Sequence, residues 1–255
     1  MISLVDNKKM SPVIRGLLLF VITGLLLIFQ ESLSQIGTHV ARLFSYRSFD
    51  PDGAFAFRAV HHIVQGVLAL LLMGILHLLF GIDFRLGLGN RRTGLRLTVQ
   101  ICAVFTLYQI IMSVLAMALK ANRPFPHPMT LRNVTGLLGF QLLLAGPSEE
   151  LLYRALPIAI LQLITRKQFS LFKGRFTITV SVIVSALLFT FAHIYWDVLP
   201  LRPVFSWPQM IYTFMLGCLQ GYLYIKTGSV VYSMFIHSYT NVLVVASFVI
   251  MQLLG

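Results

Sequence analysis

Long runs without a charged side chain constrain this chain most. Residues 59–82, 97–119, 176–196, 203–225 and 227–255 contain no Asp, Glu, Lys or Arg. Each run reaches the ~20 residues that carry an α-helix across a bilayer. Over the whole chain only 11% of residues are charged, against roughly 25% in soluble domains. We therefore expect an all-α, polytopic membrane helix bundle that forms one integral membrane domain over residues 1–255.

Seven crossings are the simplest arrangement, and an eighth depends on one segment. The expected crossings are approximately 12–30, 57–81, 97–119, 133–165, 176–196, 207–226 and 228–253. Segment 133–165 is too long for one straight crossing, and Gly146-Pro147 in its middle should kink or break it. One bent helix gives seven transmembrane helices, whereas two shorter helices give eight. The loop 31–56 is expected to hold a short amphipathic helix.

The net charge of +12 is best explained by the membrane. With the N-terminus inside, the inner segments hold twelve Lys and Arg and the outer segments seven, with Arg154 inside a span. This excess predicts a cytoplasmic N-terminus. Basic loops also favour membrane lipids with anionic head groups as partners. We expect a multi-pass protein of a bacterial cell membrane. No motif or basic stripe points to nucleic acid. Cys102 and Cys218 lie inside expected spans and indicate neither a disulfide framework nor a metal cluster.

Two adjacent acids stand where acids are costly. Of the eight Asp and Glu, only Glu149 and Glu150 lie in the middle of a span, where an ionised group costs at least ~2.5–3.5 kcal/mol. Glu150 and Arg154 are four residues apart and share a helix face, while Glu149 points about 100° away. This spacing favours a neutralised Glu150 and a Glu149 that is free to act as a base. The alternative is that all three side chains form a structural knot for helix packing.

Two further groups of polar residues lie in apolar helices. His193, in FTFAHIYWD, shares a face with Phe189 near the end of a span, and the alternative is an interfacial histidine. His237 and Asn241, in FIHSYTN, are four apart and project to one side, and the alternative is interhelical hydrogen bonding. The other histidines are interpreted as structural: His39, His61, His62, His77 and His127. When depth in the membrane is counted from the inner end of each span at ~1.5 Å per residue, His237 and Glu149 differ in depth by ~10 Å.

Taken in order, these pieces resemble the CPBP family, the CAAX proteases and bacteriocin-processing enzymes also called Abi, which includes the Ras-converting CAAX proteases. The family patterns are E-E-x-x-x-R, F-x-x-x-H and H-x-x-x-N. They stand here as Glu149-Glu150 to Arg154, Phe189 to His193, and His237 to Asn241. The resemblance covers roughly 133–245, which we expect to be the catalytic core. Many relatives have Phe and Gly around the arginine, where this chain has Tyr153 and Ala155.

The resemblance implies an intramembrane endopeptidase that hydrolyses a peptide bond of a membrane-associated peptide or protein. Glu149 would act as general base on a water that His193 helps to hold. His237 and Asn241 would stabilise the oxyanion, and Glu150, Arg154 and Phe189 would shape the site. No cofactor is expected. The alternative is zinc held by Glu149, His193 and His237, since members are often labelled metalloproteases.

Other function classes remain open from the residues. Intramembrane Glu, His and Arg also suit a transporter or a proton-relay protein, although no inverted repeat supports one. An immunity or scaffold protein with the family fold is a further alternative. For a bacterial chain we expect the substrate to be a peptide leader, a signal-peptide remnant or a membrane-bound regulator rather than a prenylated protein.

Overall fold

The computed structural model describes residues 11–121, 124–171, 176–198 and 201–254. Its α-helices are α1 (Pro12–Ala41), α2 (Ala56–Phe80), α3 (Arg91–Ala118), α4 (Leu131–Phe140), α5 (Gly146–Glu150), α6 (Leu156–Ile164), α7 (Val180–Phe191), α8 (Trp207–Thr227) and α9 (Val231–Leu254). Two π-helical turns, η1 (Gln141–Ala145) and η2 (Leu151–Ala155), join α4 to α5 and α5 to α6. Two antiparallel hairpins pair β1 (Gln168–Leu171) with β2 (Phe176–Thr179), and β3 (Tyr195–Val198) with β4 (Leu201–Val204).

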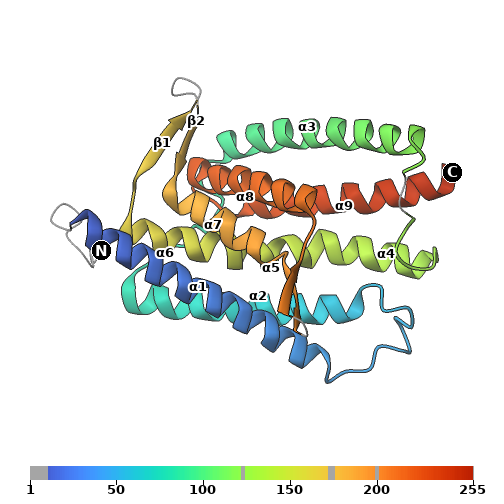
Figure 1. The fold of residues 1–255 in the computed structure, drawn as a ribbon, viewed down its shortest axis with the longest axis horizontal. Coiled ribbons are helices and arrows are strands. Elements are labelled where there is room, and N and C mark those ends of the chain that lie inside the picture. The colour runs from blue at the N-terminus through green and yellow to red at the C-terminus, as the bar shows by residue number, and fades with distance from the viewer. Residues whose placement is uncertain (1–10, 122–123, 172–175, 199–200, 255) are drawn as a thin grey trace.

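The long helices run roughly side by side, and α1 begins at the end of the bundle opposite to that where α9 ends (Figure 1). The α4–α6 segment lies in the middle. On one side it contacts α1 and α2, and on the other α9, which in turn packs against α3 and α8. The short helix α7 packs on α8 and on the α6 end of the central segment. The central segment is therefore in contact with every part of the bundle that carries a predicted site residue.

Residues with strong positional preferences mark the helix ends. A side-chain oxygen of Ser11, Asn90, Thr130 and Thr179 accepts a hydrogen bond from the N–H three residues later, at the start of α1, α3, α4 and α7. Such caps satisfy N–H groups that the first helical turn leaves free. Gly81 and Gly228 end α2 and α8 with φ of 65° and 67°, a left-handed conformation that favours glycine.

Helix α2 starts without a cap of its own and takes one from Asp50. Its N-cap residue, Phe55, offers no side-chain hydrogen bond. The Asp50 carboxylate instead accepts the N–H groups of Ala54, Phe55 and Ala56 at 2.8, 3.0 and 2.7 Å. Burial alone would raise the pKa of Asp50, but these three donors outweigh it, so that the pKa lies below its ordinary value. An ionised Asp50 therefore holds the beginning of α2 in place.

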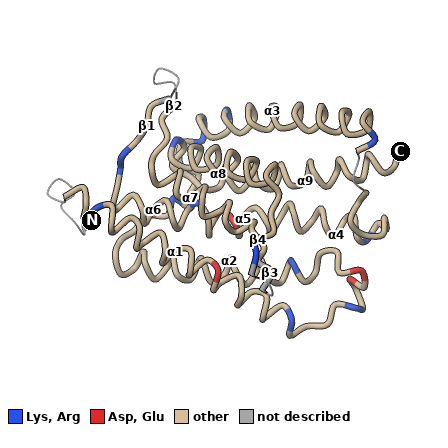
Figure 2. The backbone as a smooth tube through the Cα atoms, viewed as in Figure 1, with Lys and Arg blue, Asp and Glu red and all other residues tan. Residues whose placement is uncertain are grey.

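The architecture is that of a polytopic helical membrane protein, as the sequence predicts. Within the described residues, α1, α2, α3 and α9 are each long and apolar enough to cross a bilayer. Lys and Arg concentrate near the helix ends, whereas the acidic segment on α5 lies in the middle of the bundle (Figure 2). Of the cations counted for orientation, Lys8, Lys9, Arg123, Lys173 and Arg175 lie outside the described residues.

Two expectations about the elements are corrected. The loop 31–56 holds no short amphipathic helix, because α1 itself continues to Ala41, with Glu31 and His39 inside it, and turns follow over 42–55. The crossing expected over 176–196 is only the 12-residue helix α7, about 18 Å long, because β2 and β3 take up its two ends.

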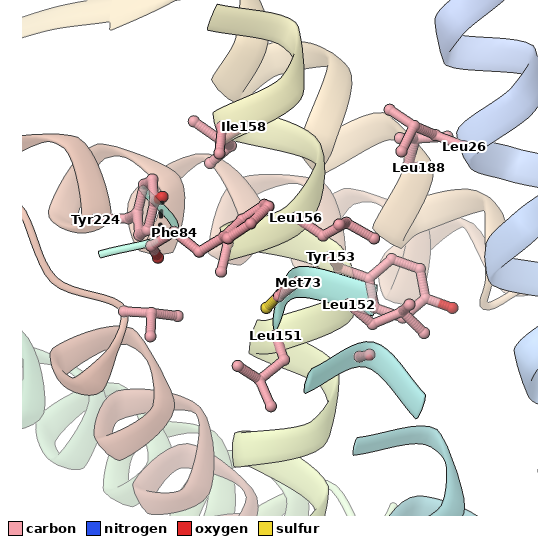
Figure 3. Packing of buried hydrophobic residues seen from close by; sticks show 14 of the residues in the cluster. Leu26, Met73, Phe84, Leu151, Leu152, Tyr153, Leu156, Ile158, Leu188 and Tyr224 are labelled. Atoms are coloured by element: carbon pink, nitrogen blue, oxygen red, sulfur yellow. Dashed lines mark hydrogen bonds between the residues drawn. The ribbon is translucent and has the colours of Figure 1, made fainter. Parts of the chain in front are cut away.

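The largest buried apolar cluster packs around η2 and α6. It includes Leu152, Leu156 and Ile158 from the central segment, each 0% exposed, with Leu188 from α7 and Tyr224 from α8 (Figure 3). The close packing of these residues fixes the position of the central helix, and therefore also the position of its polar residues one turn earlier.

Candidate active site

The central helix is continuous through Gly146-Pro147, where the sequence allowed a break into two shorter helices. The residues at both joints, Phe140 and Gln141 before and Glu150 and Leu151 after, keep right-handed helical angles. The structure thus contains one helix from Leu131 to Ile164, interrupted in its hydrogen bonding by two π turns rather than in its path. Such π turns inside α-helices are frequent at functional sites, and here they lie directly before and after Gly146–Glu150.

Neighbouring helices satisfy the carbonyl groups that the second π turn frees. The N–H of Leu156 bonds to the carbonyl of Leu151, five residues earlier. The next residue, Pro157, has no N–H to continue the ladder. The carbonyl of Leu152 instead accepts the Gln30 side chain at 2.9 Å, and that of Tyr153 accepts the Ser185 hydroxyl. Buried carbonyls in a membrane require such partners, so α1 and α7 are tied to the turn that follows the two glutamates.

Glu150 and Arg154 form the expected ion pair, and the pair is wholly buried. Arg154 Nη2 lies 3.3 Å from Glu150 Oε1, and both side chains are 0% exposed. The same carboxylate oxygen is 2.8 Å from His237 Nδ1. Arg154 also donates to the side chain of Gln220 on α8, and its guanidinium stacks 4.1 Å from the ring centre of Phe189. Glu150 is therefore committed to holding α8 and α9 against the central helix.

Glu149 has a different environment. Its Oε2 lies 3.5 Å from His237 Nε2, its Oε1 lies 3.8 Å from His62 Nε2, and its side chain is 20% exposed. No Lys or Arg of the described residues forms an ion pair with it. It lines a cavity of about 410 Å³, together with His193, Phe189 and Tyr153. The division of roles expected from helical geometry, with one glutamate paired to arginine and one available, is present.

His193 and Phe189 lie on the same wall of this cavity. The backbone carbonyl of Phe189 can only accept, so the His193 Nδ1 at 2.9 Å carries the proton and Nε2 is left with a lone pair. The Phe189 ring touches both histidines edge-on, with centroids 4.7 Å from His193 and 5.7 Å from His237. Phe189 thus separates and orients the two imidazoles.

Asn241 forms its hydrogen bond outside the cluster of Glu149, His193 and His237. Its amide donates to the side chain of Gln141 at 2.8 Å. Gln141 precedes Glu149 by eight positions on the central helix, which is about 12 Å of helical rise. The structure therefore brings His237 to the glutamates and leaves Asn241 at a neighbouring level of the same interface.

The cavity opens toward one end of the bundle. Ser34 and Thr38 from the last turns of α1, and Phe57 and Arg58 from the first turn of α2, complete its lining. A larger space of about 610 Å³ between α3 and α8 has no carboxylate, histidine, lysine or arginine among its described lining residues. Of these two cavities, the one at Glu149 combines a carboxylate with imidazoles, a set of groups suited to hydrolysis.

Residues 132–243 match the family described as Type II CAAX prenyl endopeptidase Rce1-like. This part of the chain, called the CAAX protease segment below, is similar to the CAAX protease (CPBP) family. No curated protein and no solved structure gives a significant match to the chain. The CAAX protease segment nearly coincides with the range 133–245 expected to carry the motifs. It contains every predicted site residue and excludes α1, α2 and α3.

The zinc alternative concerns Glu149, His193 and His237. Within the described residues, no three or more His, Cys, Asp or Glu side chains are grouped so that they could hold a metal ion. Of the three proposed ligands, His237 binds Glu150 through Nδ1, and His193 binds the chain through the Phe189 carbonyl. Both bonds use Nδ1, as metal-bound histidines typically do toward carboxylates and backbone carbonyls, so zinc stays an alternative at this site.

Sequence reasoning missed His62, Ser148, Gln141 and Gln220. His62 reaches Glu149 and bonds to Ser148, although it was interpreted as structural. A signal was present, because an ionisable residue inside a membrane span marks a functional site by default. The spacing of His61, His62 and His77 could not show which of them faces the central helix.

Proposed function

We propose that the chain is an intramembrane endopeptidase of the CAAX protease type, in which Glu149 activates a water molecule. The family match supports a protease of this kind. The observation that carries the glutamate mechanism is the contrast between the two acids. The Glu150 carboxylate is bound by Arg154 and His237. Glu149 instead faces a cavity, with two imidazole nitrogens within 4 Å of its carboxylate and no Lys or Arg ion-pair partner among the described residues.

The proposed hydrolysis needs only a water and a peptide bond. Glu149 accepts one proton from the water as its oxygen attacks the peptide carbonyl carbon. The tetrahedral intermediate then collapses, the C–N bond breaks, and Glu149 returns the proton to the leaving nitrogen. The products are a new carboxyl terminus and a new amino terminus, and Glu149 ends in its ionised form. His193, on the wall of the same cavity, would help to hold the water in place.

The negative charge on the former carbonyl oxygen requires donors. We assign this role to His237 and Asn241, which project from one face of α9. His237 Nδ1 bonds to the Glu150 carboxylate, so His237 carries a proton on both ring nitrogens when Nε2 donates to the oxyanion. Asn241 bonds to Gln141 in this structure, so its amide has to leave Gln141 when a substrate enters. Glu150 and Arg154 shape the site through the fixed position of His237.

We propose a metal-independent reaction, a membrane-associated peptide or protein as substrate, and membrane lipids as the surroundings. The first point rests on the carboxylate of Glu149, which can act as a general base without a metal. Metal analysis of the purified protein after chelation, together with its residual cleavage activity, tests it: the expected result is full activity without bound zinc. Loss of activity that zinc alone restores would overturn metal independence.

The excess of Lys and Arg on one side of the expected crossings supports an N-terminus in the cytoplasm. The connection over 42–55 then lies outside, and the Glu149 cavity opens toward it. A substrate would approach Glu149 from the outer half of the membrane.

N-terminal proteomics of membranes tests the function. Cells that express the wild type are compared with cells that express Glu149→Gln, at matched protein levels. We expect new N-termini in the wild-type membranes that are missing with Glu149→Gln. Glu31→Gln is the matched control, because Glu31 is an exposed carboxylate on α1 that bonds only locally, to Gln35. Identical sets of N-termini for wild type and Glu149→Gln would refute the proposal.

A further inference from the structure

A histidine from outside the CAAX protease segment lies against the proposed base. His62 is in the second turn of α2, and the family match begins at residue 132. Its Nε2 lies 3.8 Å from Glu149 Oε1, and its side chain is 14% exposed toward the cavity that Glu149 lines. Because His237 lies at Oε2, the two imidazoles contact different oxygens of one carboxylate.

The hydrogen bonds around Ser148 determine which nitrogen of His62 faces Glu149. The Ser148 hydroxyl has one proton and donates it to the carbonyl of Ala145 at 3.2 Å. With the hydroxyl proton used in this way, we assign His62 Nδ1, 2.7 Å from the same hydroxyl oxygen, as the donor of the second bond. A neutral His62 consequently carries its proton on Nδ1, and its Nε2 presents a lone pair to the side of Glu149.

Two acceptors that face each other require a donor between them. The distance of 3.8 Å between His62 Nε2 and Glu149 Oε1 exceeds the 2.7–3.2 Å of a direct hydrogen bond. A water about 2.8 Å from each atom can donate one O–H to the carboxylate and the other to the imidazole. The cavity beside both atoms has room for this water and for a peptide, with a volume of about 410 Å³.

The neighbouring histidine does not share this arrangement. His61 directs its Nδ1 to the Thr38 hydroxyl on α1, at 3.2 Å. The ring of His62 is instead fixed from two sides, by Ser148 and by an edge-on contact with Phe140 at 5.1 Å. Of the pair, His62 alone has a geometry aimed at the proposed base.

We propose that His62 positions the attacking water against Glu149 Oε1. This inference rests on the proposed function. In the reaction, His62 accepts a hydrogen bond from the proton that the water keeps, while Glu149 takes the proton that leaves. No proton is transferred to His62. Its role is to orient the water oxygen toward the peptide carbonyl, so that α2 completes a site of which the family segment supplies the rest.

Substitutions that retain one nitrogen at a time separate this role from a structural one. An asparagine places an amide where Nδ1 stands and can keep the bond to Ser148, whereas a glutamine places its amide at the position of Nε2. The readout is the rate at which the Glu149-dependent N-termini appear in membranes of cells that express each variant. We expect His62→Asn to lower this rate about 10- to 100-fold, a cost typical of a misplaced reactant, and His62→Gln to restore part of it.

Two further variants make the result decisive. Ser148→Ala removes the anchor and keeps the imidazole, so we expect a smaller loss than with His62→Asn. His77→Asn changes a histidine of the same helix that bonds only to the carbonyl of Ile82, and we expect wild-type activity. If His62→Asn cleaves like the wild type, or if Ser148→Ala loses as much as His62→Asn, His62 is only a structural partner of Ser148. The absence of Glu149-dependent cleavage in the wild type would instead refute the proposed function.

Discussion

At the scale of single residues, Glu149 and Glu150 show how one helix separates two adjacent acids by function. Glu150 is on the face that meets α8 and α9, where Arg154, His237 and Phe189 enclose it. Glu149 is on the face that meets α2 and the cavity. The sequence predicts this division, because a spacing of four aligns Glu150 with Arg154 and a spacing of one turns Glu149 away.

Arg154 should matter more for stability than any other arginine of the described chain. Arg154→Met leaves the Glu150 charge buried without its guanidinium, a change that typically costs about 3–5 kcal/mol. We expect a clear loss in thermal stability of the detergent-purified protein, measured by the unfolding midpoint. Arg92→Met, which changes an exposed arginine at the start of α3, is the control. A wild-type midpoint for Arg154→Met would show that the ion pair contributes nothing.

Asp50 should give the protein a specific sensitivity to acid. Its pKa is depressed in the folded state because three N–H groups bind the carboxylate. Its contribution to stability is therefore complete above the ordinary pKa of about 3.9 and is lost as the pH falls through the lower folded value. Asp50→Asn should be about 1–2 kcal/mol less stable near neutral pH, with the difference narrowing below pH ~4. A pH-independent difference would exclude the carboxylate as its cause.

At the scale of elements, the site depends on a close approach between α5 and α9. A Cβ at Gly146 would lie 2.8 Å from the backbone nitrogen of Ser238 and 2.9 Å from the carbonyl oxygen of Met234. Only a residue without a side chain permits this spacing, which brings His237 to both glutamates. Counting residues places His237 about 10 Å from the depth of Glu149. The contact at 3.5 Å shows that the count fails where helices tilt and π turns add residues.

Gly146→Ala should therefore disturb the site without changing any of its groups. The added methyl group pushes α9 away, so that His237 withdraws from Glu149. We expect at least a tenfold loss of the Glu149-dependent cleavage, since small displacements of reacting groups are costly. Gly139→Ala is a control on the same helix, because a Cβ there has no neighbour within 4 Å. Equal activities of the two variants would mean that the approach of α5 and α9 is not needed.

Two features of the fold could not be predicted from the local sequence, each for its own physical reason. An apolar run reports burial or lipid contact but not the choice between strand and helix, so 176–196 resembled a crossing although it contains β2, α7 and the start of β3. The position of His62 could not be predicted either. Its contact with Glu149 depends on how α2 packs against α5, a long-range relation that no local spacing encodes. The motif residues were predictable because each motif spans only a few residues, within the central helix or α9, or from α7 into the turn that follows it.

At the scale of the whole molecule, the central helix is the element around which the others assemble. The CAAX protease segment supplies Glu149, His193 and His237, and α1 and α2 close the cavity from outside that segment. The outer position of the 42–55 connection follows from the cytoplasmic N-terminus that the charge distribution predicts.

Single cysteines test this orientation. In a background with Cys102 and Cys218 replaced by Ala, cysteines are introduced by Ser11→Cys and by Ser45→Cys, both at exposed positions. A membrane-impermeant maleimide should label Ser45→Cys in intact cells and Ser11→Cys only after permeabilisation. The reverse pattern would invert the topology and place the cavity on the cytoplasmic side.

The dependence of cleavage on Glu149 is the central claim, and a purified system measures it most directly. The wild type, Glu149→Gln and Glu31→Gln are reconstituted in liposomes with a membrane protein whose new N-terminus depends on Glu149 in cells. We predict cleavage at the same bond by the wild type and by Glu31→Gln, and none by Glu149→Gln at equal folding. Cleavage by Glu149→Gln at the wild-type rate would contradict the account.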